Sequence, residues 1–396
     1  MLTLTPPNSS SPSLHLLSLL LKCAHLISAN NTASATDLLP EIFHLSSPFA
    51  ASPADRIAAF FAHSLHSRLL LHFLSATPHP LIKSITLSSQ LKSFHSALQT
   101  FNSLAPFVKF SHFTANQAIF ESVHGYDRVH IIDLDVMQGL QWPGLFHILA
   151  SRSKKVSSVR LTGFGPSSEL LNQTGSRLAE FAASLGLPFK FNPIEGKFGD
   201  MSELELTRID LRANEATVVH CMHHNLYDMI GSNFGMLRVL SIVKPKLVTM
   251  VTQNIEIFET GSFLERFIET LHYYSAMFDA LGEGLSRDNV LRHQVEQQLF
   301  GSEIRNILAC DDVGGVSVSR WGDELSRFGF EPVSLSGSPA AQASLLLEMF
   351  PWKGYTLMEE NGCLRLGWKG MPLLTASAWQ PSNYSCVTNN SNIMRN

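Results

Sequence analysis

Residues 128–142 read RVHIIDLDVMQGLQW, and this stretch decides the fold of the chain. Residues 129–134 form a short apolar run rich in β-branched side chains, which predicts a strand buried on both faces. Asp133, Asp135 and Gly139 mark a turn after it. Residues 143–150 carry apolar side chains at helical spacing, and Pro143 suits a first helical turn. Strand, acidic turn and helix together predict the opening unit of a doubly wound sheet.

The polar side chains of the turn are the first candidates for a functional site. In doubly wound sheets, ligands bind beyond the carboxyl ends of the strands. We expect Asp133, Asp135, Gln138 and Gln141 to lie there. A structural role competes with this interpretation, because aspartates in such turns accept hydrogen bonds from backbone N–H groups of the turn itself.

A nucleotide-like cofactor would place further demands on this turn. S-adenosylmethionine sites use a glycine-rich turn so that the backbone can approach the cofactor closely. Here there is one glycine, and Met137, Leu140 and Trp142 are expected to fill the space. The sequence therefore favours a protein without a cofactor. A small-molecule-binding or S-adenosylmethionine-dependent methyltransferase-like protein is the alternative.

Length and composition limit the classes of function. The chain has 396 residues, a formal net charge of −4 and 45% apolar residues, which fits a folded protein with a large core. This charge argues against a dominant electrostatic grip on nucleic acid, although local basic patches are compatible with it. Five scattered cysteines fit a reducing compartment. No apolar run is long enough to span a bilayer.

The N-terminal third reads as helical. Polar residues recur every three or four positions in residues 14–29, which predicts an amphipathic helix and not a secretory signal. Further helices are expected at residues 36–45, broken or bent at Pro40, then at 52–74, 88–104 and 111–122. Residues 1–12 and 382–396 are expected to be a disordered lead and tail, and residues 77–80 a linker.

From residue 129 onward, strands and helices alternate. We predict strands at 129–134, 156–163, 189–194, 216–222 and 246–251, with helices at 143–150, 169–185, 200–211 and 234–243. This alternation predicts a Rossmann-like, mostly parallel sheet with an N-terminal α-helical cap. Residues 262–281 and 289–308 read as helices that join the cap.

The C-terminal part predicts antiparallel strands. A strand is expected at residues 331–335, and two more at 355–360 and 363–368 flank Asn361-Gly362, a strong hairpin signal. An α/β domain that closes with such a hairpin resembles the class I methyltransferase architecture, which is a likeness of fold only.

Four further groups of residues each have a functional and a structural interpretation. Leu16, Leu17, Leu19, Leu20 and Leu21 contain two overlapping Leu-x-x-Leu-Leu patterns, which either dock into a partner or pack within the cap. His220, Cys221, His223 and His224 are metal-capable types, but neighbours on a strand point to opposite faces.

The tryptophans and a basic segment complete the candidates. Trp321, Trp368 and Trp379 are read as core anchors first and as a partner surface second. Arg152, Lys154, Lys155 and Arg160 could form a basic spot that gives weak, salt-sensitive contact with DNA.

The motif Val129-His130-Ile131-Ile132-Asp133 strongly resembles the central motif of the plant GRAS family. The resemblance covers about residues 14–381, with leucine-rich regions on both sides of the motif. The remaining family motifs are matched in order by Pro188, Tyr273, Tyr274, Arg305, Trp321, Gly329, Trp368, Ser377, Ala378 and Trp379. Residues 107–118, 129–151 and 373–379 are most similar to the SCARECROW and SCARECROW-like branch. In Thr252-Gln253-Asn254, where the family commonly has Glu-Gln-Asp or Glu-Gln-Glu, Thr252 and Asn254 depart from acidic positions, as does Asn306.

The resemblance implies a regulator of transcription in plant development that is located in the nucleus, with the cytoplasm as an additional location. It implies partners of two kinds, namely other GRAS proteins, including a SHORT-ROOT-like one in a heterodimer, and C2H2 zinc-finger transcription factors. It implies contact with DNA that is indirect or weak, no membrane and no cofactor. The expected GRAS domain covers residues 13–381, with a helical cap at 13–125 and an α/β core at 126–381 that contains a cap insertion at about 262–308.

Overall fold

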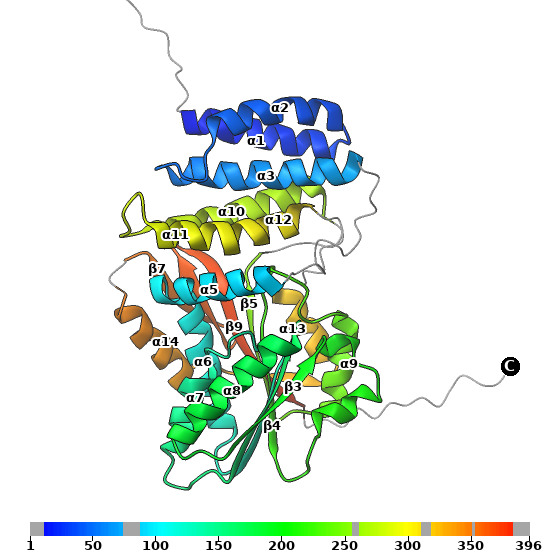
Figure 1. Ribbon diagram of the computed structural model, residues 1–396, viewed down its shortest axis with the longest axis vertical. Helices are drawn as coiled ribbons and strands as arrows, with labels where there is room; N and C mark the ends of the chain where they lie inside the picture. The colour runs from blue at the N-terminus through cyan, green and yellow to red at the C-terminus, as the bar shows by residue number, and fades with distance from the viewer. Residues whose placement is uncertain (1–11, 74–87, 256–260, 310–317, 351–352, 383–396) are drawn as a thin grey trace, which may run out of the picture.

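A nine-stranded sheet lies at the centre of the part of the chain that the computed structural model describes, residues 12–73, 88–255, 261–309, 318–350 and 353–382 (Figure 1). The strand order is β3-β2-β1-β4-β5-β9-β8-β7, and β6 pairs with the end of β9. The strands are β1 (Arg128–Asp133), β2 (Ser158–Gly165), β3 (Phe189–Glu195), β4 (Ala216–Met222), β5 (Leu247–Gln253), β6 (Phe330–Val333), β7 (Tyr355–Glu360), β8 (Cys363–Trp368) and β9 (Met371–Pro381).

The sheet confirms the fold class predicted from the sequence. Strands β1 to β5 pair in parallel, and β9 joins β5 in the antiparallel direction. The apolar run of β1 lies in the middle of the parallel strands, where Ile131 is paired with Leu161 on one side and with Val218 on the other. The predicted hairpin forms between β7 and β8, and Asn361 and Gly362 both have positive φ, as a type I′ turn requires.

Helices cover both faces of the sheet. These are α6 (Phe107–Ser122), α7 (Trp142–Ala150), α8 (Ser168–Ser184), α9 (Asn233–Val243), α13 (Val318–Arg327) and α14 (Ser338–Glu348). Helix α6 falls inside the range expected for the cap, but it packs against β5, β9 and α7, with α14 beside it. The expected boundary at residue 125 is therefore wrong for this helix, because its buried side chains complete the core of the sheet.

A layer of helices lies over the carboxyl ends of the parallel strands (Figure 1). It contains α1 (Pro12–Ser28), α2 (Thr32–Leu45), α3 (Pro53–Phe73), α10 (Phe263–Gly282), α11 (Val290–Val295), a π-helical turn η3 (Glu296–Phe300) and α12 (Gly301–Ala309). Helix α5 (Ser88–Leu104) lies between this layer and the sheet, in contact with α11, η3 and α6. We call the layer without α5 the helical cap. Its division from the core as separate units stays a prediction.

Residues far apart in sequence hold the cap together. Helix α3 packs against α10 and α12, so the N-terminal helices rest on the later insertion. The guanidinium of Arg56 donates to both carboxylate oxygens of Glu296 at 3.0–3.2 Å, and both side chains are almost fully buried. A break at Pro40 is not seen, because α2 continues through it.

Residues 200–211 were expected to form one helix, and this prediction was wrong. Two short 3-10 helices occur instead, η1 (Phe198–Asp200) and η2 (Glu205–Ile209). Gly199 donates from its backbone N–H to the carbonyl of Ile230, and a Cβ on Gly199 would lie 2.3 Å from the Ser232 oxygen. This close backbone approach fixes the segment against the start of α9 and overrides helical propensity.

Three sequence-based expectations fall outside the described residues. These are most of the N-terminal lead, the linker at 77–80 and the tail after residue 382. Within the described residues, none of the helices combines the length and apolarity needed to cross a membrane.

Candidate functional site

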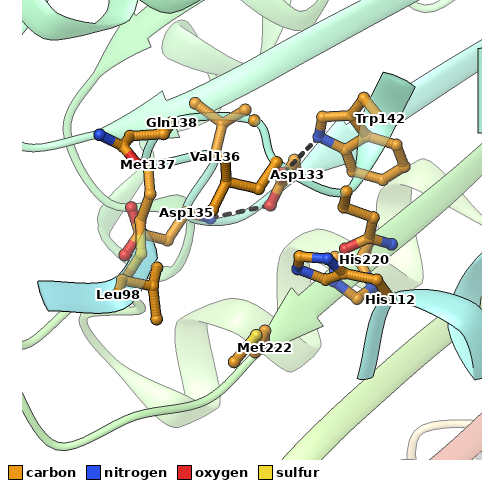
Figure 2. Close-up of a pocket in the computed structure, with 13 residues that line it drawn as sticks. Leu98, His112, Asp133, Asp135, Val136, Met137, Gln138, Trp142, His220 and Met222 are labelled. Carbon is orange, nitrogen blue, oxygen red and sulfur yellow. Dashed lines mark hydrogen bonds between the residues drawn. The ribbon is translucent and has the colours of Figure 1, made fainter. Parts of the chain in front are cut away.

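The acidic turn after β1 is occupied by its own side chains (Figure 2). Asp133 is buried, and its carboxylate accepts hydrogen bonds from the indole N–H of Trp142 at 2.9 Å and from the backbone N–H of Asp135 at 3.2 Å. The second contact is the bond that the structural interpretation of this turn predicts. Burial, followed by the nearby Asp135 carboxylate, raises the pKa of Asp133 to about 7.

Asp135 points the other way, toward the segment after β4. Its carboxylate oxygen Oδ2 accepts hydrogen bonds from Tyr227 at 2.6 Å and from His224 at 3.0 Å. The backbone N–H of Leu226 donates to Nδ1 of His224, so the proton of a neutral His224 ring is on Nε2. The two aspartates of the turn therefore have separate structural roles, and one oxygen of Asp135, Oδ1, is buried without a hydrogen-bond partner among the described residues.

Of the other two polar residues of the turn, Gln141 is hydrogen-bonded and Gln138 lines a small cavity. Gln141 exchanges two hydrogen bonds with Asn116 of α6. Gln138 lines the cavity at this turn, whose volume is about 40 Å³ and whose walls include His112, Met137 and Trp142 (Figure 2). A neighbouring cavity of about 60 Å³ shares Leu98, Met137 and Met222 with it.

These volumes decide whether a nucleoside cofactor fits. A buried water needs about 10–15 Å³, whereas pockets for drug-sized ligands have several hundred. The two cavities have room for only a few water molecules each. Met137 and Trp142 fill the turn as the sequence predicted, so its side chains do not fit S-adenosylmethionine.

The histidine cluster after β4 does not converge on one point. His220 is hydrogen-bonded to the Thr249 hydroxyl at 2.9 Å, while His224 is hydrogen-bonded to Asp135. Burial lowers the pKa of His220 to about 3 and raises the pKa of Cys221. Within the described ranges, no three His, Cys, Asp or Glu side chains are placed to hold a metal ion.

His130 of the central motif has a structural explanation that the sequence did not provide. Arg160 donates to its Nδ1 at 3.2 Å, and because arginine has only donors, the ring must carry its proton on Nε2, which faces Thr162 Oγ1 at 2.9 Å. Arg160 also makes a paired contact with the buried carboxylate of Glu215 at 2.6–3.0 Å. Burial and then Arg160 lower the pKa of His130 to about 3, so the ring stays neutral near pH 7.

A second polar cluster, which the sequence reasoning missed, joins the cap to the core. Glu303 of α12 accepts from the backbone N–H of Asn225, from Gln253 and from the Tyr274 hydroxyl at 2.9–3.1 Å. Asn306 donates to the carbonyls of Asn225 and Leu226 at 2.7–2.8 Å. Asn306 departs from an acidic position of the family pattern, and a neutral amide is required here because its nitrogen donates both of these hydrogen bonds.

The remaining motif residues are spread through the molecule. Tyr273 and Tyr274 are fully buried in α10, Trp321 in α13 and Trp368 in β8 are buried, and the Trp368 indole donates to Asp279 of α10 at 2.7 Å. Gly329 has a φ of +81°. Pro188 and Arg305 are exposed, and Ser377, Ala378 and Trp379 pair along β5. The three tryptophans lie in the core, as predicted, and the motif does not form one site.

Two other predictions need correction. Leu16, Leu19 and Leu20 are buried and Leu21 packs against the core, so among these leucines only Leu17 is exposed. The amphipathic helix directs its leucine stripe inward, and the five leucines cannot serve together as a partner surface. In the expected basic spot, Arg160 is buried, and Arg152 donates to the carbonyls of Phe120, Val123 and Tyr126.

The profile of the GRAS domain family matches residues 16–380. The chain belongs to the GRAS family. It is 54% identical over 376 residues to Scarecrow-like protein 23 of Arabidopsis thaliana, an alignment that covers 95% of this chain and 92% of the relative. It is 50% identical to Protein SCARECROW of the same plant and 51% identical to that of Pisum sativum, covering 93% of this chain but 56% and 44% of those relatives.

The GRAS chain therefore spans about half the length of the SCARECROW proteins that it matches. A crystal structure of SCL7 in Oryza sativa has the same fold, with a TM-score of 0.75, 29% identity and coverage of 92% of this chain and 99% of that one. The expected family and branch are confirmed. These relatives are consistent with a regulator of plant development.

Asp133 of the GRAS motif leads to a pH prediction. Because its folded pKa is raised to about 7 from the ordinary 3.8, the folded state binds this proton more tightly than the unfolded chain. The contribution of Asp133 to stability is therefore largest below pH 4 and is lost as pH rises toward 7, by about 1.4 kcal/mol per pKa unit. We expect the stability difference between wild type and Asp133→Asn, measured by urea unfolding, to change by about 3–4 kcal/mol across this range. An unchanged difference would contradict the buried, proton-binding carboxyl.

Proposed function

We propose that this GRAS protein, located in the plant nucleus and also in the cytoplasm, regulates transcription by joining protein complexes and not by catalysis. Its partners would be a second GRAS protein of the SHORT-ROOT-like kind and a C2H2 zinc-finger transcription factor that binds the promoter. Family membership supports the class of function. The small cavities at the acidic turn argue against a cofactor-dependent enzyme.

The observation that carries this proposal is an exposed apolar surface on one side of the helical cap. The start of α1, the end of α2 and α11 lie on the same side (left in Figure 1). We call the exposed side chains there the apolar cap surface: Leu17, Leu45, Phe49, Val290 and Leu291. Phe49 is 62% and Val290 76% exposed, which is unusual for side chains that gain so much from burial.

Contacts between these segments place them side by side. His15 of α1 lies 3.3 Å from Glu41 of α2, one turn before Leu45. The Phe49 ring lies 5.3 Å from the ring of His293 in α11. Exposed apolar patches of this kind mark protein–protein interfaces, and their central aromatic and aliphatic residues carry most of the binding energy.

A pairing experiment tests the surface directly. We expect Phe49→Glu/Val290→Glu to weaken binding to a GRAS partner about 1000-fold in calorimetric titration, because each of the two buried anchors contributes on the order of 2 kcal/mol. The matched control is Leu70→Glu/Phe73→Glu, which places two charges on exposed apolar positions at the end of α3. Equal loss in both variants, or full affinity in the first, would contradict this location.

A gel-shift assay on promoter DNA tests the function as a whole. It compares this chain, a C2H2 zinc-finger partner, and both together at physiological salt. We expect the sequence-specific complex of the zinc-finger protein to shift further only in the mixture. A sequence-specific shift by this chain alone, or no further shift in the mixture, would overturn the tethered regulator.

A further inference from the structure

The loop between α2 and α3 places a serine within the apolar cap surface (Figure 1). Ser47 is followed by Pro48. Leu45 precedes Ser47 by two residues and Phe49 follows it by two, and both belong to that surface, with 41% and 62% exposure. Since Cα atoms two residues apart are separated by at most about 7 Å, the Ser47 hydroxyl lies among side chains that the proposed pairing would bury.

Ser47 is held in a short turn outside the helices. Helix α2 ends at Leu45, and α3 begins at Pro53. The carbonyl of Ser47 accepts a hydrogen bond from the N–H of Ala50 at 3.1 Å, and its hydroxyl accepts one from the N–H of Phe49 at 3.3 Å. Ser47 is half-exposed. Because these hydrogen bonds are local, opening the turn leaves both helices intact and presents the segment to another protein.

A serine followed by proline is the acceptor sequence of proline-directed protein kinases, which bind substrates in an extended form. Pro48 restricts Ser47 to extended backbone conformations, which suits such an enzyme. Ser52-Pro53 is a second pair of this kind, but Ser52 caps α3, since its hydroxyl accepts the N–H of Asp55 at 3.5 Å. A kinase would have to unwind the start of α3 to reach Ser52, whereas Ser47 requires only the opening of a turn.

A phosphate on Ser47 would turn the middle of an apolar surface into a charged one. Phosphoserine carries a charge of about −1.5 to −2 at neutral pH. Burying such an ion against an apolar partner removes its hydration and opposes binding. Arg56 donates to the carbonyls of Ala50 and Ala51 beside the turn at 3.1 Å. Its guanidinium is buried and paired with Glu296, so it cannot accompany the phosphate into an interface.

We propose that Ser47 is phosphorylated by a proline-directed kinase and that this modification blocks pairing through the apolar cap surface. The inference rests on the proposed function, because it assigns the regulation of the surface defined there. In the reaction, Ser47 Oγ forms a bond to the γ-phosphorus of ATP, the bond from that phosphorus to the bridging oxygen breaks, and ADP leaves. The hydroxyl proton passes to the catalytic aspartate of the kinase. Because the partner would cover Ser47, pairing and phosphorylation oppose each other in both directions.

The site is tested on the full chain without any partner protein. The folded chain is incubated with a purified mitogen-activated protein kinase and Mg²⁺-ATP, and its peptides are sequenced by mass spectrometry. We expect phosphate on Ser47, and none at this position in Ser47→Ala. A folded chain that carries phosphate on Ser52 but not on Ser47, or on neither serine, would overturn the site. An excess of the GRAS partner should slow the labelling of Ser47.

Calorimetric titration with the GRAS partner measures the consequence. The phosphorylated chain should bind about 100-fold more weakly than the unmodified chain, and Ser47→Glu at least about tenfold more weakly. Ser47→Ala should bind like the wild type, before and after treatment with the kinase. The matched control is Ser67→Glu, which adds a charge about 20 Å along α3 from its first residue and should retain binding.

The outcomes separate this inference from the proposed function. Equal binding by the phosphorylated and unmodified chains would overturn the regulation and leave pairing intact. Equal losses in Ser47→Glu and Ser67→Glu would also overturn it, because the effect would then be one of net charge and not of position. Failure of the unmodified chain to bind any GRAS partner would overturn the proposed pairing instead.

Discussion

Glu296→Ala is expected to destabilise the protein by about 3–5 kcal/mol, one of the two largest effects that the structure predicts. The Glu296 carboxylate is fully buried. It accepts hydrogen bonds from Arg56 at 3.0–3.2 Å and lies 3.4 Å from Nε of Arg292. Its removal leaves two guanidinium groups near each other inside the cap. Urea unfolding measures the change in the free energy of unfolding.

A double variant separates the ion pair from simple packing. Arg56→Met/Glu296→Leu removes both charges while keeping apolar volume, so it should cost clearly less than Glu296→Ala. An exposed pair serves as the control, since Glu324→Ala breaks the contact of Glu324 with Arg327 at 2.8 Å on the surface and should cost below about 0.5 kcal/mol. A Glu296→Ala protein as stable as the wild type would contradict the buried pair.

Trp142→Ala is expected to cost about 3–5 kcal/mol as well, because the indole is completely buried and its removal leaves a large cavity. The loss has a second part. Asp133 loses the indole N–H that it accepts at 2.9 Å and keeps one backbone donor inside the core. Thermal and urea unfolding, followed by far-ultraviolet circular dichroism, measure the effect.

Trp142→Phe is the matched variant, because it keeps most of the ring and removes the donor. We expect a cost of about 1–3 kcal/mol, the range for a buried acceptor that loses its partner. If Trp142→Phe and Trp142→Ala had the same cost, packing would contribute nothing and the hydrogen bond alone would matter. Adding Asp133→Asn to Trp142→Phe should have a smaller effect than Asp133→Asn alone, since the two residues share one contact.

Local patterns were sufficient to predict most of the elements. The boundaries of α5, β4, β7 and β8 agree with the sequence-based expectation, because period, capping and turn residues lie within a few positions of each other. The segment at 200–211 failed for the opposite reason. Its conformation depends on the approach of Gly199 to the backbone before α9, about 30 residues away, and no local pattern contains that information.

The amino-acid sequence by itself determined the positions of the parallel strands along the chain, the acidic turn, the hairpin at Asn361-Gly362 and the family, since each is written in short periodic or ordered motifs. Only the tertiary structure decided which side chains are free to act. It buried Leu16, Leu19 and Leu20, engaged Arg160 with Glu215, and left Phe49 and Val290 on the surface. Burial and ion pairing are contacts between distant segments, so a linear pattern specifies which residues exist but not which of them meet.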